Sequence, residues 1–134
     1  MRFWKLFADG SSKGNPGRAG IGVVLVNPEG RTVVCASEPI GVATNNIAEY
    51  KALIRGMEIA LKSGAEYLQV CVDSELLVKQ LIGEYKVRAS NLLPLHNEVR
   101  RLQSQFRAVE YRHVPRGANE DADKLASQAA EEGN

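Results

Sequence analysis

The first third of the chain contains short, largely apolar runs, separated by turn residues, that indicate β-strands. The runs are Arg2 to Asp9, Ala19 to Val26, and Thr32 to Ser37, the last two separated by the tight reversal Asn27-Pro28-Glu29-Gly30. Glycines and a proline between residues 10 and 17 favour a further turn. Three consecutive strands joined by short turns predict an antiparallel meander.

From residue 47 onwards the hydrophobic period changes to that of a helix. Apolar residues keep helical spacing from Ile47 to Leu61, and Gly64 follows as a stop. The later elements are predicted as a strand over Tyr67 to Val72, a short helix from Leu76 to near Gly83, a helix over Leu92 to Phe106, a strand over Ala108 to Val114, and a last helix from about Asn119.

The resulting order, β-β-β-α-β-α-α-β-α, predicts a single α/β domain over residues 1–134. We expect a five-stranded mixed sheet, with three antiparallel strands followed by two parallel ones, flanked by helices. Right-handed crossovers would place the fourth and fifth strands parallel to the first. Ligands of such sheets gather at the carboxyl ends of the parallel strands. Asp9 and Asp73 end the first and fourth predicted strands, so we expect them side by side.

Composition narrows the function classes only modestly. The 134 residues are 44% hydrophobic and 25% charged, as in ordinary globular proteins, with a formal net charge of +1. This charge argues against binding nucleic acid by a broad basic surface, but it leaves room for a nucleic-acid enzyme with a local patch and metal ions. Cys35 and Cys71 lie in β-rich apolar runs, so we expect both to be reduced and buried. No leader or membrane-spanning run is visible, and a cytoplasmic location is expected.

Four acidic residues stand out because each lies in a short polar string beside apolar residues. They are Asp9, Glu49, Asp73 and Asp123. Each has a local alternative: a turn residue for Asp9, a capping box for Glu49, a helix N-cap for Asp73, and a first-turn acid for Asp123. Together they would form a cage of carboxylate oxygens, which suits hard divalent cations and reactions on phosphate.

The residues around these acids resemble type 1 ribonuclease H. The similarity runs in order from about Phe3 to Ala129 and includes the element order of the ribonuclease H-like fold. Four strings carry it: Asp9-Gly10-Ser11 with Gly14-Asn15-Pro16-Gly17, Thr44-Asn45-Asn46-x-Ala48-Glu49, Asp73-Ser74, and Asn119-x-x-Ala122-Asp123-x-Leu125-Ala126.

The resemblance implies an endoribonuclease that uses two Mg²⁺ or Mn²⁺ ions to cut the RNA strand of an RNA/DNA hybrid. It implies 5′-phosphate and 3′-hydroxyl products and a monomeric protein without membrane attachment; double-stranded RNA is a further candidate substrate. Metal binding and catalysis would fall to Asp9, Glu49, Asp73 and Asp123. Substrate contacts would come from Gly10, Ser11, Asn15, Asn45, Asn46 and Ser74. Either His113 or Arg116 would act near the scissile phosphate, and Arg116 is slightly favoured because a guanidinium is always charged.

One departure from many relatives concerns substrate binding. A basic, tryptophan-containing protrusion is missing, since Glu84 to Asn91 is short and carries only Lys86 and Arg88 as basic residues. We therefore expect weak, strongly salt-dependent hybrid binding. A catalytically silent module that binds hybrid or double-stranded RNA remains an alternative. A phosphoacceptor signalling domain is a third one, although the residues before Asp9 lack the second acid that it needs.

Overall fold

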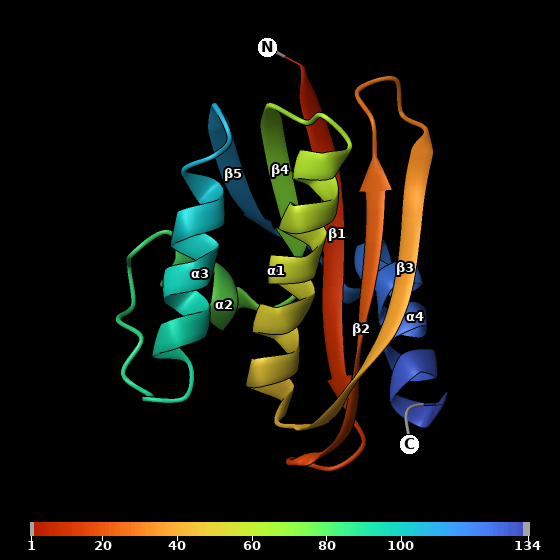
Figure 1. Cartoon of the computed structure of the whole chain (residues 1–134), viewed down its shortest axis with the longest axis vertical. Coiled ribbons are helices and arrows are strands. Elements are labelled where there is room, and N and C mark those ends of the chain that lie inside the picture. The colour runs from red at the N-terminus through yellow and green to blue at the C-terminus, as the bar shows by residue number, and fades with distance from the viewer. Residues whose placement is uncertain (1, 133–134) are drawn as a thin grey trace.

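Residues 2–132, which the computed structural model describes, fold around a five-stranded mixed sheet in the order β3-β2-β1-β4-β5 (Figure 1). The strands are β1 (Phe3–Ser12), β2 (Gly17–Val26), β3 (Thr32–Ala43), β4 (Tyr67–Val72) and β5 (Ala108–His113). The helices are α1 (Asn45–Lys62), α2 (Glu75–Leu81), α3 (Leu93–Gln103), the 3₁₀ helix η1 (Arg116–Asn119) and α4 (Glu120–Glu132). β1, β2 and β3 are antiparallel, whereas β4 and β5 run parallel to β1, which confirms the predicted architecture.

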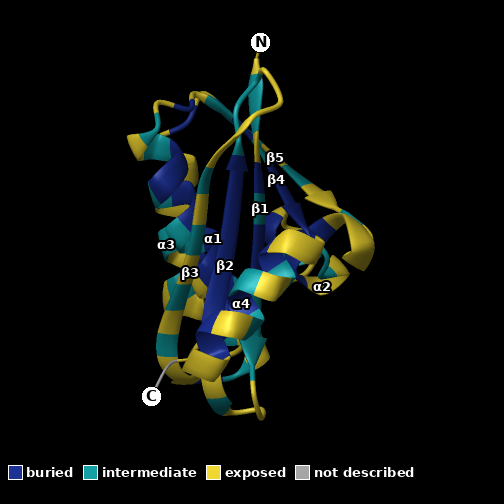
Figure 2. Ribbon diagram, turned by 90° about the vertical axis from the view of Figure 1, so that its right-hand side faces the viewer, coloured by how far each residue is buried: buried dark blue, intermediate teal, exposed yellow. Residues whose placement is uncertain are grey.

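Helices cover both faces of this sheet. α1 packs on β1 and β2 and also contacts α3, while α4 lies on the opposite face against β1, β2 and β3 (Figures 1 and 2). The core between α1 and the sheet contains fully buried Leu6, Leu53, Met57, Leu68 and Val70. Figure 2 shows β2 buried along most of its length between the two helical layers. No helix among residues 2–132 is both long enough and apolar enough to cross a bilayer.

The approach of α4 to the sheet depends on a glycine in β2. A Cβ atom on Gly22 would lie 2.1 Å from the carbonyl oxygen of Ala122, so the backbone of α4 rests directly on the strand. Gly22 pairs with Asp9 across the β1–β2 ladder. The close contact therefore brings the first turn of α4, which carries Asp123, to the level of Asp9.

Strand ends are the part of the fold that differs from prediction. Asp9 does not end β1, because the strand continues to Ser12 through its pairing with β2. The parallel ladder with β4 does end earlier, at the pair Phe7–Cys71, so Asp9 lies just past it. Asp73 likewise follows the last residue of β4. Both acids therefore lie at the carboxyl edge of the parallel part of the sheet, although neither is a terminal strand residue.

The prediction that both cysteines are buried is wrong for Cys35. Both thiols are free, but only Cys71 is buried, whereas Cys35 is exposed. The reason is position in the sheet: β4 is an inner strand, while β3 is an edge strand whose residues alternate between half-buried and exposed.

Candidate active site

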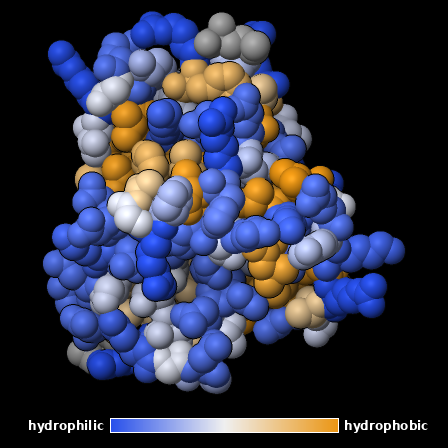
Figure 3. Space-filling view, turned by 180° about the vertical axis from the view of Figure 1, so that it is seen from behind, coloured by the Kyte–Doolittle hydropathy of each residue, from blue (hydrophilic) through white to orange (hydrophobic). Residues whose placement is uncertain are grey.

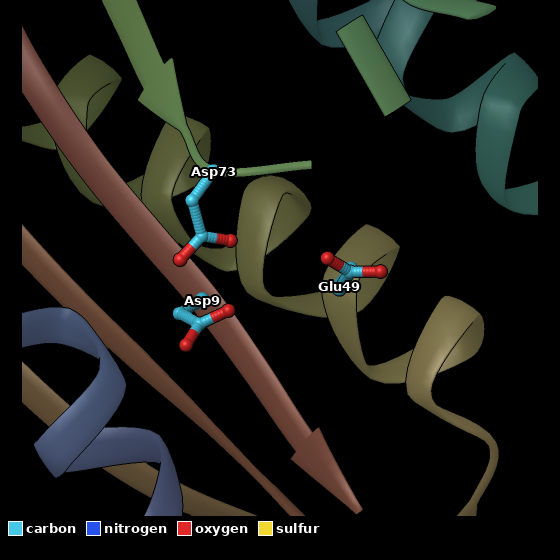
Figure 4. Close-up of side chains that lie close together, drawn as sticks. All are labelled: Asp9, Glu49 and Asp73. Carbon is cyan, nitrogen blue, oxygen red and sulfur yellow. The ribbon is translucent and has the colours of Figure 1, made fainter. Parts of the chain in front are cut away.

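Three carboxylates from three different elements meet at this edge of the sheet. Asp9 comes from β1, Asp73 from the residue after β4, and Glu49 from the second turn of α1 (Figure 4). One carboxylate oxygen of each lies within 4.8 Å of the others. Oxygen donors gathered in this way are the ligand set that Mg²⁺ and Mn²⁺ prefer.

Asp123 and Arg116 lie in the same cavity as the three carboxylates. A cavity of about 370 Å³ contains the three carboxylates together with Asp123 of α4 and Arg116 of η1. The other residues that line it are Gly10, Ser11, Ser12 and Asn45. The four acids expected from the sequence thus share one cavity, with Arg116 as the cation that lines it among residues 2–132.

Burial and mutual repulsion raise the pKa of two of these acids, Asp9 and Glu49. The pKa of Asp9 is raised from 3.8 to about 8, mainly by burial and then, in decreasing order, by the hydrogen bond with Asp123 and the charges of Asp73, Asp123 and Glu49. Burial, followed by the charge of Asp73, raises the pKa of Glu49 from 4.5 to about 7. Carboxyl groups that resist ionisation in this way favour either a proton or a divalent cation as the compensating charge.

Neighbouring residues, and not the acids themselves, make the local caps. Thr44 caps α1 by accepting a hydrogen bond from the Ile47 amide at 3.2 Å. Ser74 caps α2 by accepting from the Leu77 amide at 3.2 Å. The capping roles considered for Glu49 and Asp73 are therefore taken by other side chains, and both carboxylates remain directed at the cavity.

Gly10 sets the distance between β1 and the start of α1. A Cβ atom at this position would lie 2.2 Å from the carbonyl carbon of Ala48 and 2.4 Å from the amide nitrogen of Glu49. Only glycine permits this contact without displacing backbone. Gly10, which directly follows Asp9, therefore allows β1 and α1 to lie close enough for Asp9 and Glu49 to share the cavity.

The polar residues expected at the substrate fall into two groups. Gly10, Ser11 and Asn45 line the cavity, whereas Asn46 is exposed outside it and Ser74 serves as the cap of α2. Asn15 accepts a hydrogen bond from the Asn45 amide at 3.0 Å, and the Asn45 side chain accepts one from the Ser12 amide at 3.0 Å. These two bonds attach the β1–β2 turn to the start of α1.

Sequence reasoning did not name Ser12, although this residue also lines the cavity. Its hydroxyl donates to the carbonyl of Ala43 at 2.8 Å and so joins β1 to the end of β3. Its place directly after Gly10-Ser11 was the available signal, but the expected end of β1 at Asp9 put it in a turn.

Arg116 and His113 occupy different places. Arg116 lines the acidic cavity. His113 is the exposed last residue of β5, paired with Val72, and does not line this cavity. Its charge acts instead on Glu75, whose pKa is lowered first by the hydrogen bond with Lys79 and more weakly by His113. Of the two candidates, Arg116 is therefore the one that lies beside the four acids.

The fold and this site define a class of protein that comparison with known families identifies. A family model described as "Reverse transcriptase-like" matches residues 7–129, nearly the whole chain. Ribonuclease H of Nitrosomonas eutropha is 36% identical over 151 residues, covering 98% of this chain and 91% of that protein. The chain belongs to the type 1 ribonuclease H family.

Longer relatives and solved structures agree with this assignment. The bifunctional protein Rv2228c of Mycobacterium tuberculosis is 47% identical over 123 residues, which are 91% of this chain but 34% of that protein. The chain thus spans about a third of the length of that relative. RNase H1 from the archaeon Halobacterium salinarum superposes with a TM-score of 0.94 at 40% identity, covering 96% of this chain and 98% of that one. LC11-RNase H1, solved in complex with an RNA/DNA hybrid, superposes with a TM-score of 0.90 at 36% identity, covering 96% of each chain.

Proposed function

We propose that this chain is a metal-dependent endoribonuclease that hydrolyses the RNA strand of RNA/DNA hybrids, leaving 5′-phosphate and 3′-hydroxyl ends. The observation that carries the proposal is the convergence of Asp9, Glu49 and Asp73, whose oxygens lie within 4.8 Å of one another in a cavity shared with Asp123. Support also comes from LC11-RNase H1, a relative that is solved with an RNA/DNA hybrid.

The donor set fits a pair of hard divalent cations. Asp9, Glu49, Asp73 and Asp123 would hold two Mg²⁺ or Mn²⁺ ions, because carboxylates can bridge ions and their repulsion is relieved by positive charge. When bound, such ions supply an activated water and stabilise the departing oxygen. The raised pKa values of Asp9 and Glu49 mean that metal and protons compete for the same oxygens.

The remaining residues of the cavity would position the substrate. Arg116 offers a permanently charged guanidinium to a phosphate oxygen. Gly10 and Ser11 present backbone groups on β1, and Asn45 presents an amide at the start of α1. Such groups can hydrogen-bond the 2′-hydroxyl, which distinguishes the RNA strand from DNA.

The direct experiment is cleavage of a labelled RNA/DNA hybrid in Mg²⁺ or Mn²⁺ by the wild type, by Asp9→Asn and by Asp121→Asn. Asp121 is an exposed acid of α4 and serves as the matched control. Loss of the Asp9 carboxylate should remove several kcal/mol of transition-state stabilisation. The cleavage rate of Asp9→Asn should therefore fall by about 10²- to 10³-fold or more, while Asp121→Asn keeps wild-type activity. Hybrid binding without cleavage in either metal would refute the enzyme and indicate a binding module.

A further inference from the structure

A hydrogen bond from a buried tyrosine joins the element that carries Glu49 to the element that follows Asp73. Tyr50 comes directly after Glu49 in α1 and is 1% exposed. Its hydroxyl donates to the side-chain oxygen of Gln80 in α2 at 2.7 Å, and Asp73 lies two residues before α2 begins. Among residues 2–132, no other hydrogen bond joins these two helices directly.

Gln80 is held by its main chain as well as by its side chain. Its carbonyl oxygen lies 3.3 Å from the Nε2 atom of His96, a buried residue of α3. The rings of Tyr50 and His96 meet edge to face, with their centroids 6.3 Å apart. Two neighbouring helices, α1 and α3, therefore hold the same residue of α2 through polar contacts.

The helix that carries Gln80 has few other contacts to fix its position. α2 spans seven residues, and helices of this length are not stable on their own. Its inner side buries Leu77, Val78 and Leu81, whereas Leu76 on its outer side is 47% exposed. Figure 3 shows hydrophobic side chains at the surface on this flank, so the outer side of α2 is open to solvent.

We propose that Tyr50 and Gln80 are positioning residues that hold Glu49 and Asp73 at the spacing that a divalent cation requires. This inference rests on the proposed function. Neither residue lines the acidic cavity, so both act through the two carboxylates, which lie with Asp9 within 4.8 Å of one another.

The physical reason is the directionality of a hydrogen bond. Apolar contacts between α1 and its neighbours favour burial but no single orientation, whereas a hydrogen bond has a defined length and angle. A bond from the residue after Glu49 to α2 therefore fixes α2, and with it the residues that lead into α2, against the helix that carries Glu49. Groups outside the ligands that orient a metal site typically contribute about 10- to 100-fold to metal affinity.

A second tyrosine provides a matched control. Tyr111 of β5 donates to the side-chain oxygen of Gln103 at 2.7 Å, which is the same kind of bond at the same distance. It joins β5 to the end of α3 and does not line the acidic cavity. Tyr50→Phe and Tyr111→Phe each remove one hydroxyl and one such bond, but only Tyr50→Phe removes the bond between α1 and α2.

The experiment is calorimetric titration of Mn²⁺ into the substrate-free wild type and its variants at a fixed pH. Tyr50 and Gln80 act one step further from the metal than groups that contact its ligands, so Tyr50→Phe should raise the Kd for Mn²⁺ about fivefold or more. Gln80→Met, which removes the acceptor, should do the same. Tyr111→Phe should stay within about twofold of the wild type. The double variant Tyr50→Phe/Gln80→Met should bind no more weakly than the weaker single variant, because both residues act through one bond.

A purely structural role for Tyr50 gives a different result. Both Tyr→Phe variants would then lose stability in urea unfolding without a selective change in Mn²⁺ affinity. Unchanged affinity in folded Tyr50→Phe protein, or an equal loss of affinity in Tyr111→Phe, would overturn the proposal and leave the proposed function in place.

Failure of the proposed function is recognised separately. Metal titration needs neither substrate nor cleavage, so the comparison among variants holds even if the wild type binds Mn²⁺ but leaves the hybrid intact. In an active enzyme, a higher Mn²⁺ concentration should restore the cleavage rate of Tyr50→Phe toward that of the wild type. A rate that stays low at saturating Mn²⁺ would contradict a role through metal affinity.

Discussion

Replacing the Asp9 carboxyl by a carboxamide tests the electrostatics of the site without metal or substrate. Asp9 is 8% exposed and shares a hydrogen bond with Asp123. Its pKa is raised from 3.8 in the ordinary carboxyl to about 8 in the folded protein. Folded protein therefore keeps a proton that the unfolded chain releases, and its free energy of unfolding falls as the pH rises between these two values.

The size of the effect follows from linkage of one proton. The contribution of the Asp9 proton to the free energy of unfolding is complete below pH 3.8. It declines by about 1.4 kcal/mol per pH unit above that value and is lost above about pH 8. Asp9→Asn has no such proton. The free energy of unfolding of Asp9→Asn minus that of the wild type should therefore increase by about 4 kcal/mol from pH 5 to pH 8.

The assay is urea unfolding of wild type and Asp9→Asn in EDTA at pH 5, 6, 7 and 8. Asp121→Asn is the control, and its difference from the wild type should stay constant with pH. Adding Mg²⁺ at pH 8 should stabilise the wild type more than Asp9→Asn, because bound metal replaces the proton. A difference between Asp9→Asn and the wild type that is the same at pH 5 and pH 8 would refute the reasoning.

Four further substitutions probe the site and its surroundings. Gly22→Ala should lower the free energy of unfolding by about 2 kcal/mol or more in urea unfolding and weaken stabilisation by Mg²⁺, because the new methyl group pushes α4 and Asp123 from the sheet. Arg116→Ala should lower kcat about 10- to 100-fold on saturating hybrid, whereas His113→Ala should stay within about twofold; equal losses would contradict the assignment of Arg116. Tyr50→Phe should cost about 1 kcal/mol in urea unfolding by removing the hydrogen bond to Gln80, and no cost would show that the bond is not formed in solution.

The order and type of the elements could be predicted because the hydrophobic period changes sharply near residue 47. Strand ends could not, because residues 10–12 of β1 are Gly-Ser-Ser, which have low strand propensity and are held by pairing with β2. β3 likewise continues past Ser37 through Pro39, which an edge strand tolerates, with a register shift at Ala19/Gly20 on β2. Pairing partners, and not local preference, decide these residues.

The carboxylates at the sheet edge could be predicted from topology, since parallel strands place Asp9 and Asp73 together. The position of Asp123 was harder to predict from the sequence, because it depends on α4 packing directly against the β2 backbone at Gly22. Nothing in the spacing of apolar residues reports that contact. The capping roles considered for Glu49 and Asp73 were excluded only when Thr44 and Ser74 were seen to make the caps.

Close packing and charge repulsion act on the same residues of the acidic cavity. The contacts at Gly10 and Gly22 bring α1 and α4 close enough to bury Asp9, and burial is the largest cause of its raised pKa. Carboxylates gathered in this way also repel a polyanion unless positive charge is bound among them. With a net charge of +1, the chain has little positive charge overall to offset that repulsion.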